Sequence, residues 1–248
     1  MRRIDLHTHT CFCDGDNSPE EMVLSAIEKG LDVIGILAHS FVKQDPEGSL
    51  LPAKEDEFIT EVNRLKEKYK DRIEVLVGVE MDMFSHVDTS RFDYVIGSCH
   101  YVEKDGKLRA IDISEDDFVN TVSELFDGDY ESAYQYYYAS LSSLKARTNA
   151  GIVGHVDLIT KYNDGNKYFD TCSEKYINSY KKAVEKLIED GLVFEVNTGG
   201  MHKYKNEPYP SKEICEYIKE KGGKLMLSSD AHKKEDVAYL FEKYENQI

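Results

Sequence analysis

One stretch near the beginning of the chain decides the fold: Arg2-Arg3-Ile4-Asp5-Leu6-His7-Thr8-His9-Thr10. Its side chains alternate in type, which predicts a β-strand. Residues two apart face the same way in a strand, so Asp5, His7 and His9 are expected on one side. Two imidazoles at this spacing can bind one metal ion, but they can also simply end an edge strand. Ligands from elsewhere in the chain are needed to decide between these alternatives.

The pattern of a strand followed by a helix recurs along the chain. Mostly apolar runs, typical of strands covered on both faces, lie near residues 31–38, 73–79, 92–99, 151–154, 192–196 and 224–229. Helical stretches are predicted near residues 19–29, 55–69, 114–126, 129–149, 173–190, 211–221 and 234–245. Together with the first stretch this gives seven βα units, and repeated βαβ units imply parallel strands. We therefore expect an α/β barrel whose loops meet at one mouth.

Residues able to bind metal follow nearly every predicted strand. Each one alone has another explanation, such as a capping aspartate or a core histidine. Together they are hard to dismiss, because unpaired charges at the ends of buried strands are costly unless something coordinates them. Such nitrogen and oxygen donors suit zinc, iron or manganese. The candidate ligands are His7, His9, Asp14, His39, Glu80, His100, His155, Asp230 and His232.

Composition narrows the classes of function. A chain of 248 residues favours a single domain. The formal net charge of −16 argues against a protein that follows a nucleic-acid backbone, and an anionic substrate would then need a local positive centre such as bound metal. No apolar run suggests a membrane span or a signal peptide, and five scattered cysteines favour a reducing cytoplasm. Cys11 and Cys13, beside the histidines, are either soft ligands or small loop residues.

The segment between His100 and Gly151 departs from the strand–helix rhythm. A hairpin is expected at residues 101–108, where Asp105-Gly106 is a good turn dipeptide. Two helices follow, and the second places Tyr130, Tyr134, Tyr137 and Tyr138 at helical spacing. These tyrosines either pack in the core or cap the barrel mouth and contact an aromatic substrate.

The ordered set of motifs resembles the PHP superfamily, named for polymerase and histidinol phosphatase. The resemblance lies in His7-Thr8-His9, His39, Glu80, Gly97-Ser98-Cys99-His100, Gly154-His155 and Ser229-Asp230-Ala231-His232. The chain most resembles the stand-alone histidinol-phosphate phosphatases, through Asn197-Thr198-Gly199-Gly200, Glu207-Pro208-Tyr209-Pro210-Ser211 and the tyrosine-rich insertion. This resemblance implies a distorted (β/α)7 TIM-like barrel of PHP type as a single domain over residues 1–248, with a hairpin and helical insertion at about 101–150.

The resemblance also implies a trinuclear centre of three divalent transition-metal ions, zinc, iron or manganese. One ion would be held by His7, His9, Glu80 and Asp230, a second by the bridging Glu80 with His100 and His155, and the third by Asp14, His39 and His232. A hydroxide bridging two ions would attack the phosphate in line, and Asp230 or His232 would shuttle the proton of the leaving group. Asp5 is expected to orient a ligating imidazole.

Three departures from the family pattern affect these expectations. Asp14 stands where relatives often have a histidine, and Ala38 stands where they commonly have an acidic residue. Relatives often contact phosphate with arginines in the loops after the fifth and sixth strands. Here the corresponding candidates for substrate binding are Lys161, His202 and Lys203, and a lysine supplies a point charge in place of the arginine fork.

The resemblance implies a phosphomonoesterase that hydrolyses L-histidinol phosphate to L-histidinol and phosphate, a step of histidine biosynthesis. A first alternative is a PHP-type phosphoesterase acting on another small phosphate or a nucleotide, and a second is a non-catalytic metal-binding module. The expected partner is a small-molecule phosphate, without nucleic-acid polymer or membrane, and the oligomeric state is left open.

Overall fold

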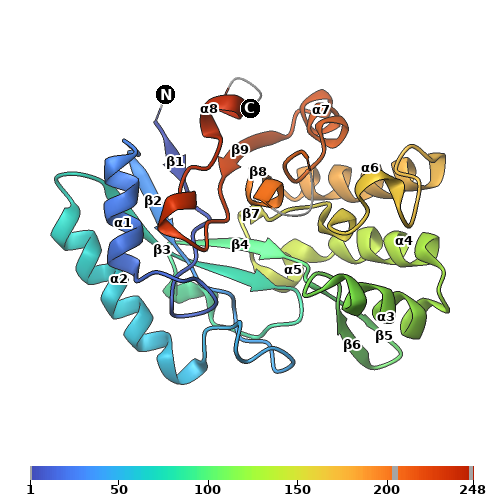
Figure 1. Cartoon of the computed structure of the whole chain (residues 1–248), viewed down its shortest axis with the longest axis horizontal. Coiled ribbons are helices and arrows are strands. Elements are labelled where there is room, and N and C mark those ends of the chain that lie inside the picture. The colour runs from blue at the N-terminus through green and yellow to red at the C-terminus, as the bar shows by residue number, and fades with distance from the viewer. Residues whose placement is uncertain (1, 203–205, 246–247) are drawn as a thin grey trace.

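Seven parallel strands form a nearly closed barrel in the computed structural model, which describes residues 2–202, 206–245 and 248, without the side chain of His202 (Figure 1). Around the barrel the strands run β1 (Ile4–Asp5), β2 (Val33–Ile36), β3 (Glu74–Asp82), β4 (Tyr94–Ser98), β7 (Ile152–Val153), β8 (Val193–Asn197) and β9 (Lys224–Ser228). A parallel bridge between Thr8 and Ala231 joins the first strand segment to the last, and the His9 N–H donates to the Ala231 carbonyl at 2.8 Å. The predicted (β/α)7 barrel is confirmed.

Helices surround this barrel, with α1 and α2 on one side and α3, α4, α6 and α7 on the other (Figure 1). The α-helices are α1 (Pro19–Glu28), α2 (Glu55–Tyr69), α3 (Glu115–Phe126), α4 (Tyr130–Leu141), α5 (Leu144–Thr148), α6 (Glu174–Glu189), α7 (Lys212–Glu220) and α8 (Phe241–Tyr244). Short 3₁₀ turns are η1 (Pro52–Lys54), η2 (Thr89–Arg91), η3 (Leu158–Thr160), η4 (Asp164–Asn166), η5 (Gly199–His202) and η6 (Lys234–Asp236). No described helix is long and apolar enough to cross a membrane.

The first helix shows how local sequence fixes these boundaries. Ser18 precedes α1 in extended conformation, and its hydroxyl accepts from the Glu21 N–H while the Glu21 carboxylate accepts from the Ser18 N–H. This reciprocal capping box satisfies two backbone donors that a helix start leaves unpaired, and Pro19 supplies a helical φ at the first position.

The prediction of a helix over residues 234–245 is wrong. The chain forms only η6 and the single turn α8, and Ala238 and Leu240 between them have φ of 53°. The Lys29 ammonium donates to the carbonyls of Glu235 and Val237, and the Asp5 carboxylate accepts from the Ala238 N–H at 2.9 Å. Side chains from other elements therefore take the backbone groups that a helix would have paired.

Two glycines make room for a tyrosine inside the barrel. A Cβ at Gly35 of β2 or Gly78 of β3 would lie 2.1–2.2 Å from side-chain atoms of Tyr94. The Tyr94 side chain lies over both glycines, and its hydroxyl donates to the Leu6 carbonyl at 2.6 Å. Tyr94 therefore helps to fill the barrel interior beside Ile96, so the barrel is a packed core and not a pore.

The segment after His100 forms an antiparallel hairpin of β5 (Tyr101–Lys104) and β6 (Lys107–Ala110), followed by α3, α4 and α5. Asp105 and Gly106 occupy the turn with φ of 53° and 74°. On α4, Tyr134, Tyr137 and Tyr138 are buried, and the Tyr138 hydroxyl contacts the Tyr176 hydroxyl of α6 at 2.8 Å. The tyrosine stripe therefore packs α4 against α6 and does not line the barrel mouth.

Candidate metal centre

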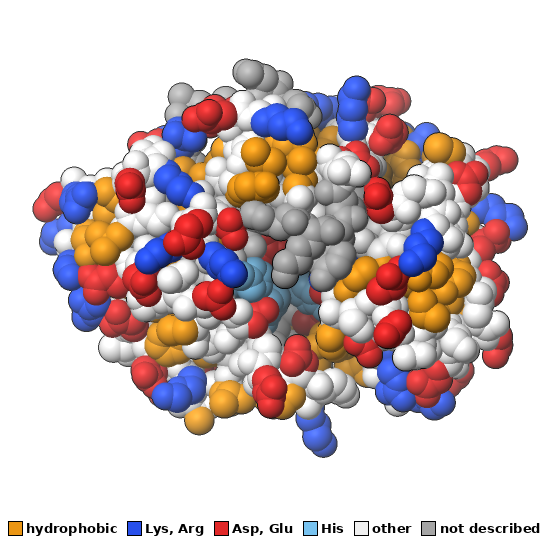
Figure 2. Space-filling model, in the orientation of Figure 1, with side chains coloured by type: hydrophobic (Ala, Val, Ile, Leu, Met, Phe, Trp, Pro, Cys, Tyr) orange, Lys and Arg blue, Asp and Glu red, His pale blue; other side chains and the backbone are white. Residues whose placement is uncertain are grey.

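The predicted ligands gather at the carboxyl ends of the barrel strands. A parallel bridge three residues beyond β2, in register with the β2–β3 pairing, sets His39 beside Glu80, and the Thr8–Ala231 bridge places His7 and His9 beside Asp230 and His232. Figure 2 shows histidine side chains at the bottom of a hollow in the molecular surface. A cavity of about 410 Å³ opens there, lined by Asp14, His39, His100, His155, Asp230 and His232 among others.

The first group of donors consists of two imidazoles and a carboxylate that face one another. His7 Nε2 lies 3.1 Å from His9 Nε2, and Asp230 Oδ1 lies 3.3 Å from the first nitrogen and 3.2 Å from the second. Atoms that share one ion with bonds of about 2.1 Å lie about 3.0–3.5 Å apart. Two buried ring nitrogens directed at each other and at a carboxylate are spaced as ligands of one ion, so these residues fit a divalent metal.

Glu80 is fully buried at the centre of the cluster and lies between two sets of imidazoles. Its Oε2 lies 2.8 Å from His39 Nδ1, 3.3 Å from His7 Nε2 and 3.5 Å from His9 Nε2, yet it makes no hydrogen bond to a described residue. Its Oε1 lies 2.9 Å from His155 Nε2 and 3.3 Å from His100 Nε2. One carboxylate thus presents a separate oxygen to each set, as a ligand that bridges two ions does.

A third group lies closer to solvent. His232 Nε2 is 3.1 Å from Asp14 Oδ2, while His39 Nε2 and His9 Nδ1 are 3.6 Å and 3.8 Å from Asp14 Oδ1. The rings of His39 and His232 both stack on His9, with centroids 4.2 Å away. The structure therefore brings Asp14, His39 and His232 together, with His39 directed at both Asp14 and Glu80.

Electrostatics favour positive charge among these carboxylates. Burial raises the pKa of Glu80, but the neighbouring His39, His7 and His100 outweigh it and hold that pKa well below its usual range. Burial likewise raises the pKa of Asp230, and His7 and His9 hold it well below the ordinary value. The carboxyl groups therefore stay ionised, as hard metal ligands must be.

The imidazoles respond in opposite ways to this environment. Burial, aided by His232 and His39, lowers the pKa of His9 to about 3, so this ring is neutral at pH 7. Burial also lowers the pKa of His100, but Glu80 and Asp82 raise it to about 10. A neutral ring such as that of His9 can bind a metal ion without losing a proton. A protonated ring such as that of His100 must first release its proton to make room for the ion.

The ligands are supported by groups that sequence reasoning missed. Glu195 Oε2 lies 2.8 Å from His7 Nδ1, and Asp82 Oδ2 lies 3.3 Å from His100 Nδ1. Glu195 is the one acidic residue in the apolar run Leu192-Val193-Phe194-Glu195-Val196, and that placement is the only feature of the sequence that could have indicated its role. Asp5, expected to orient an imidazole, instead accepts from the backbone N–H groups of His7, Ser229 and Ala238.

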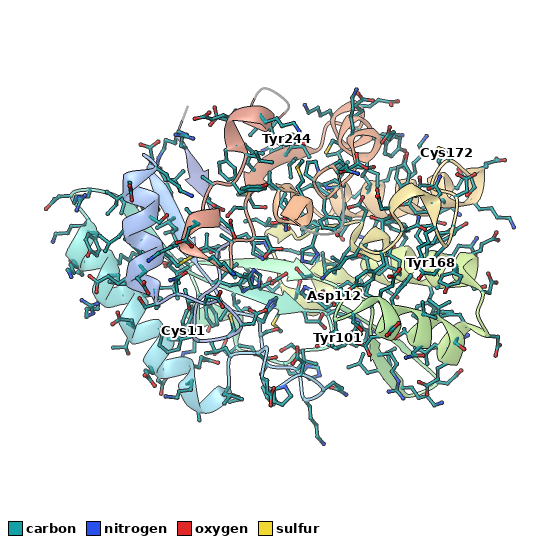
Figure 3. All side chains as sticks on the ribbon, viewed as in Figure 1. Cys11, Tyr101, Asp112, Tyr168, Cys172 and Tyr244 are labelled. Carbon is teal, nitrogen blue, oxygen red and sulfur yellow. The ribbon has the colours of Figure 1, made fainter. Side chains whose placement is uncertain are left out.

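Lys161 lies at the wall of the same cavity, together with Asp112. Its ammonium donates to the Asp112 carbonyl at 2.7 Å and lies 3.5 Å from the Asp112 carboxylate. Asp112 lies between the hairpin and α3, so the segment after the hairpin contributes to this wall (Figure 3). Of the other substrate-binding candidates, Lys203 lies outside the described residues, as does the side chain of His202.

The cysteines beside the histidines do not join the metal-binding groups of the described residues. Cys13 Sγ lies 3.5 Å from His9 Nδ1 and donates to the Thr10 carbonyl, and Cys11 is exposed. Burial raises the pKa of the Cys13 thiol, which disfavours the thiolate that a soft ligand requires.

Comparison with known proteins agrees with this geometry. The chain is 27% identical to histidinol-phosphatase of Bacillus subtilis over 98% of both chains, and 27% identical to histidinol-phosphatase of Lactococcus lactis over 94% of this chain and 85% of that one. The crystal structure of a candidate histidinol phosphatase from Listeria monocytogenes has a TM-score of 0.86 at 24% identity, covering 98% of this chain and all of that one.

A second similar structure is histidinol phosphate phosphatase from Lactococcus lactis, solved with zinc, L-histidinol and phosphate. Its TM-score is 0.73 at 22% identity, covering all of this chain and 92% of that one. At these identities the two structures show a shared fold. The PHP domain family matches residues 5–199, a range that includes His7, Glu80, His100 and His155. With most of its length inside that match, the chain belongs to the PHP domain family.

Proposed function

We propose that this protein is a metal-dependent phosphomonoesterase that hydrolyses L-histidinol phosphate to L-histidinol and phosphate. The observation that carries the proposal is the buried Glu80 carboxylate, whose two oxygens face separate sets of imidazoles at the barrel mouth. The substrate is proposed from the similarity to histidinol-phosphatases along nearly the whole chain. We also propose that residues 1–248 form one PHP barrel domain with the segment at about 101–150 inserted.

The proposed centre holds three divalent transition-metal ions. His7, His9, Asp230 and Glu80 would hold one ion, Glu80, His100 and His155 a second, and Asp14, His39 and His232 the third. Bound ions of this kind lower the pKa of water and neutralise charge on phosphoryl oxygens. The zinc in the Lactococcus lactis structure makes zinc the first ion to test, with iron and manganese next.

The protein's own residues would position the substrate and move the proton. Lys161, held by Asp112 at the cavity wall, supplies a positive charge for a phosphate oxygen. Asp230 and His232 both line the cavity, and we propose that one of them passes a proton to the leaving alkoxide. His202 and Lys203 are further candidates for contacting phosphate.

Elemental analysis of the purified protein, coupled to phosphate release from L-histidinol phosphate, tests this function. The same preparation should be assayed with ribose 5-phosphate, AMP and bis(p-nitrophenyl) phosphate. We expect metal-dependent release from the monoesters, fastest with L-histidinol phosphate. Preference for a diester without histidinol-phosphate turnover would favour the wider phosphoesterase alternative, and full metal occupancy without turnover of any ester would favour a metal-binding module.

A further inference from the structure

We propose that Glu195 is a positioning residue of the metal centre, which holds His7 with its Nε2 lone pair toward the ion. Glu195 lies on β8, is 1% exposed and lies outside the nine-ligand set. The inference rests on the proposed metal centre and is independent of which phosphate ester is the substrate.

Donors surround the Glu195 carboxylate completely. Its Oε1 accepts from the His155 N–H at 2.7 Å and from Asn197 Nδ2 at 3.0 Å. Its Oε2 accepts from the Ser228 hydroxyl at 2.8 Å and faces His7 Nδ1, also at 2.8 Å. Two bonds to each oxygen leave the carboxylate little freedom to rotate, so its position relative to His7 is fixed by strands β8 and β9 and the end of β7.

This arrangement determines the tautomer of His7. A carboxylate only accepts hydrogen bonds, so the ring nitrogen facing it must carry the proton. Nδ1 of His7 is therefore the donor to Glu195, and Nε2, which faces His9 and the Asp230 carboxylate, is the nitrogen whose lone pair would bind the ion. A ligating imidazole that donates through its other nitrogen to a carboxylate is a recurrent support for metal sites.

The same carboxylate reaches two further ligands. Its bond to the His155 N–H fixes the main chain that carries the His155 ring. The Asn197 side-chain amide donates to Glu195 Oε1 and to Asp230 Oδ2, both at 3.0 Å. Glu195 thereby links ligands of both proposed ions that share Glu80.

Replacing Glu195 with glutamine gives a sharp test, because the new amide cannot satisfy all four donors. The backbone N–H of His155 cannot become an acceptor, so the amide oxygen is expected on that side and the amide NH₂ toward His7. His7 must then accept at Nδ1 and carry its proton on Nε2, where the metal bond should form. We expect Glu195→Gln to weaken binding of the first ion by about 10- to 100-fold.

The matched control is Ser228→Ala, which removes another donor to the same carboxylate oxygen but leaves the His7 contact intact. Zinc content per chain and zinc affinity, measured by chelator competition on protein shown to be folded by circular dichroism, are compared in the two variants and the unmodified protein. Loss of zinc in Glu195→Gln with retention in Ser228→Ala supports the proposal. Unchanged zinc affinity in Glu195→Gln, or equal loss in both variants, overturns it.

A second measurement observes the His7 tautomer in the unmodified protein and needs no turnover. Long-range ¹H–¹⁵N NMR of the histidine-labelled protein distinguishes Nδ1–H from Nε2–H rings, and His7→Gln assigns the His7 signal by its disappearance. In the zinc-loaded protein we expect His7 to be protonated at Nδ1 alone, and a zinc-loaded ring protonated at Nε2 would overturn the assignment. If this test succeeds while histidinol phosphate is not hydrolysed, the proposed substrate is wrong and the role of Glu195 remains.

Discussion

Removing the charge of Glu80 should empty two metal sites at once. In Glu80→Gln the side chain keeps its shape, but the amide can offer only one oxygen to the imidazoles that now face both carboxylate oxygens. Loss of one member of a buried charged set costs about 3–5 kcal/mol. At about 1.4 kcal/mol per tenfold change, this corresponds to affinity weaker by about a hundredfold to a few thousandfold for each ion that shares the group.

Metal stoichiometry measures this directly. After dialysis against a weak chelator, elemental analysis is expected to give three ions per chain for the unmodified protein and about one for Glu80→Gln, with phosphate release lost in parallel. Glu74→Gln is the matched control, because Glu74 lies on the same strand but pairs with Arg2 at the surface. Loss of a single ion, or three ions retained at unchanged affinity, would refute the bridging role of Glu80.

Three further changes probe other parts of the centre. Asp14→Ala should remove only the outermost ion, lowering the measured stoichiometry by one; loss of all ions would contradict the separate third site. Lys161→Met should raise KM for phosphate monoesters about tenfold with kcat nearly unchanged, whereas Lys167→Met, a surface lysine paired with Glu115, should change neither in steady-state assays. The raised pKa of His100, about 10, means that its proton stabilises the fold fully below about pH 6.5 and that this contribution is lost as pH rises toward 10. Thermal melts of chelator-treated protein should therefore fall in midpoint across that window, while metal-loaded protein should not show this fall.

The periodic parts of the fold could be predicted from sequence because local signals and burial agree there. The helix expected at residues 55–69 is α2 with the same bounds, and the turn at Asp105 and Gly106 lies where that dipeptide indicates. The prediction fails where side chains distant in sequence form hydrogen bonds with the backbone groups that a regular helix would pair. Lys29 binds carbonyls near residue 236, and no pattern within 234–245 reveals that contact.

The candidate site divides in a similar way. The end of a parallel strand is recognisable in sequence, so all nine candidate ligands could be located, and the structure brings them to one mouth. The residues that support the ligands, such as Glu195 and Asp82, could not be identified from the sequence, because their roles depend on which side chains face one another across the barrel. Asp5 and Glu195 are both buried acids, yet the first binds backbone N–H groups and the second an imidazole. Alternation along one strand does not distinguish these two outcomes.

The Thr8–Ala231 bridge joins the two ends of the barrel sheet through the N–H groups of His9 and Ala231, which donate to the carbonyls of Ala231 and His7. His9 and Asp230 flank that bridge, so an ion shared between them would hold together the two ends of the sheet, which pair at an isolated bridge and not as full strands. Closing a loop of more than 200 residues is entropically costly. The junction between the first and last strands would therefore form last during folding and open first during unfolding. The metal centre would then exist only once the final strand has docked, and bound ions would slow unfolding of the whole barrel.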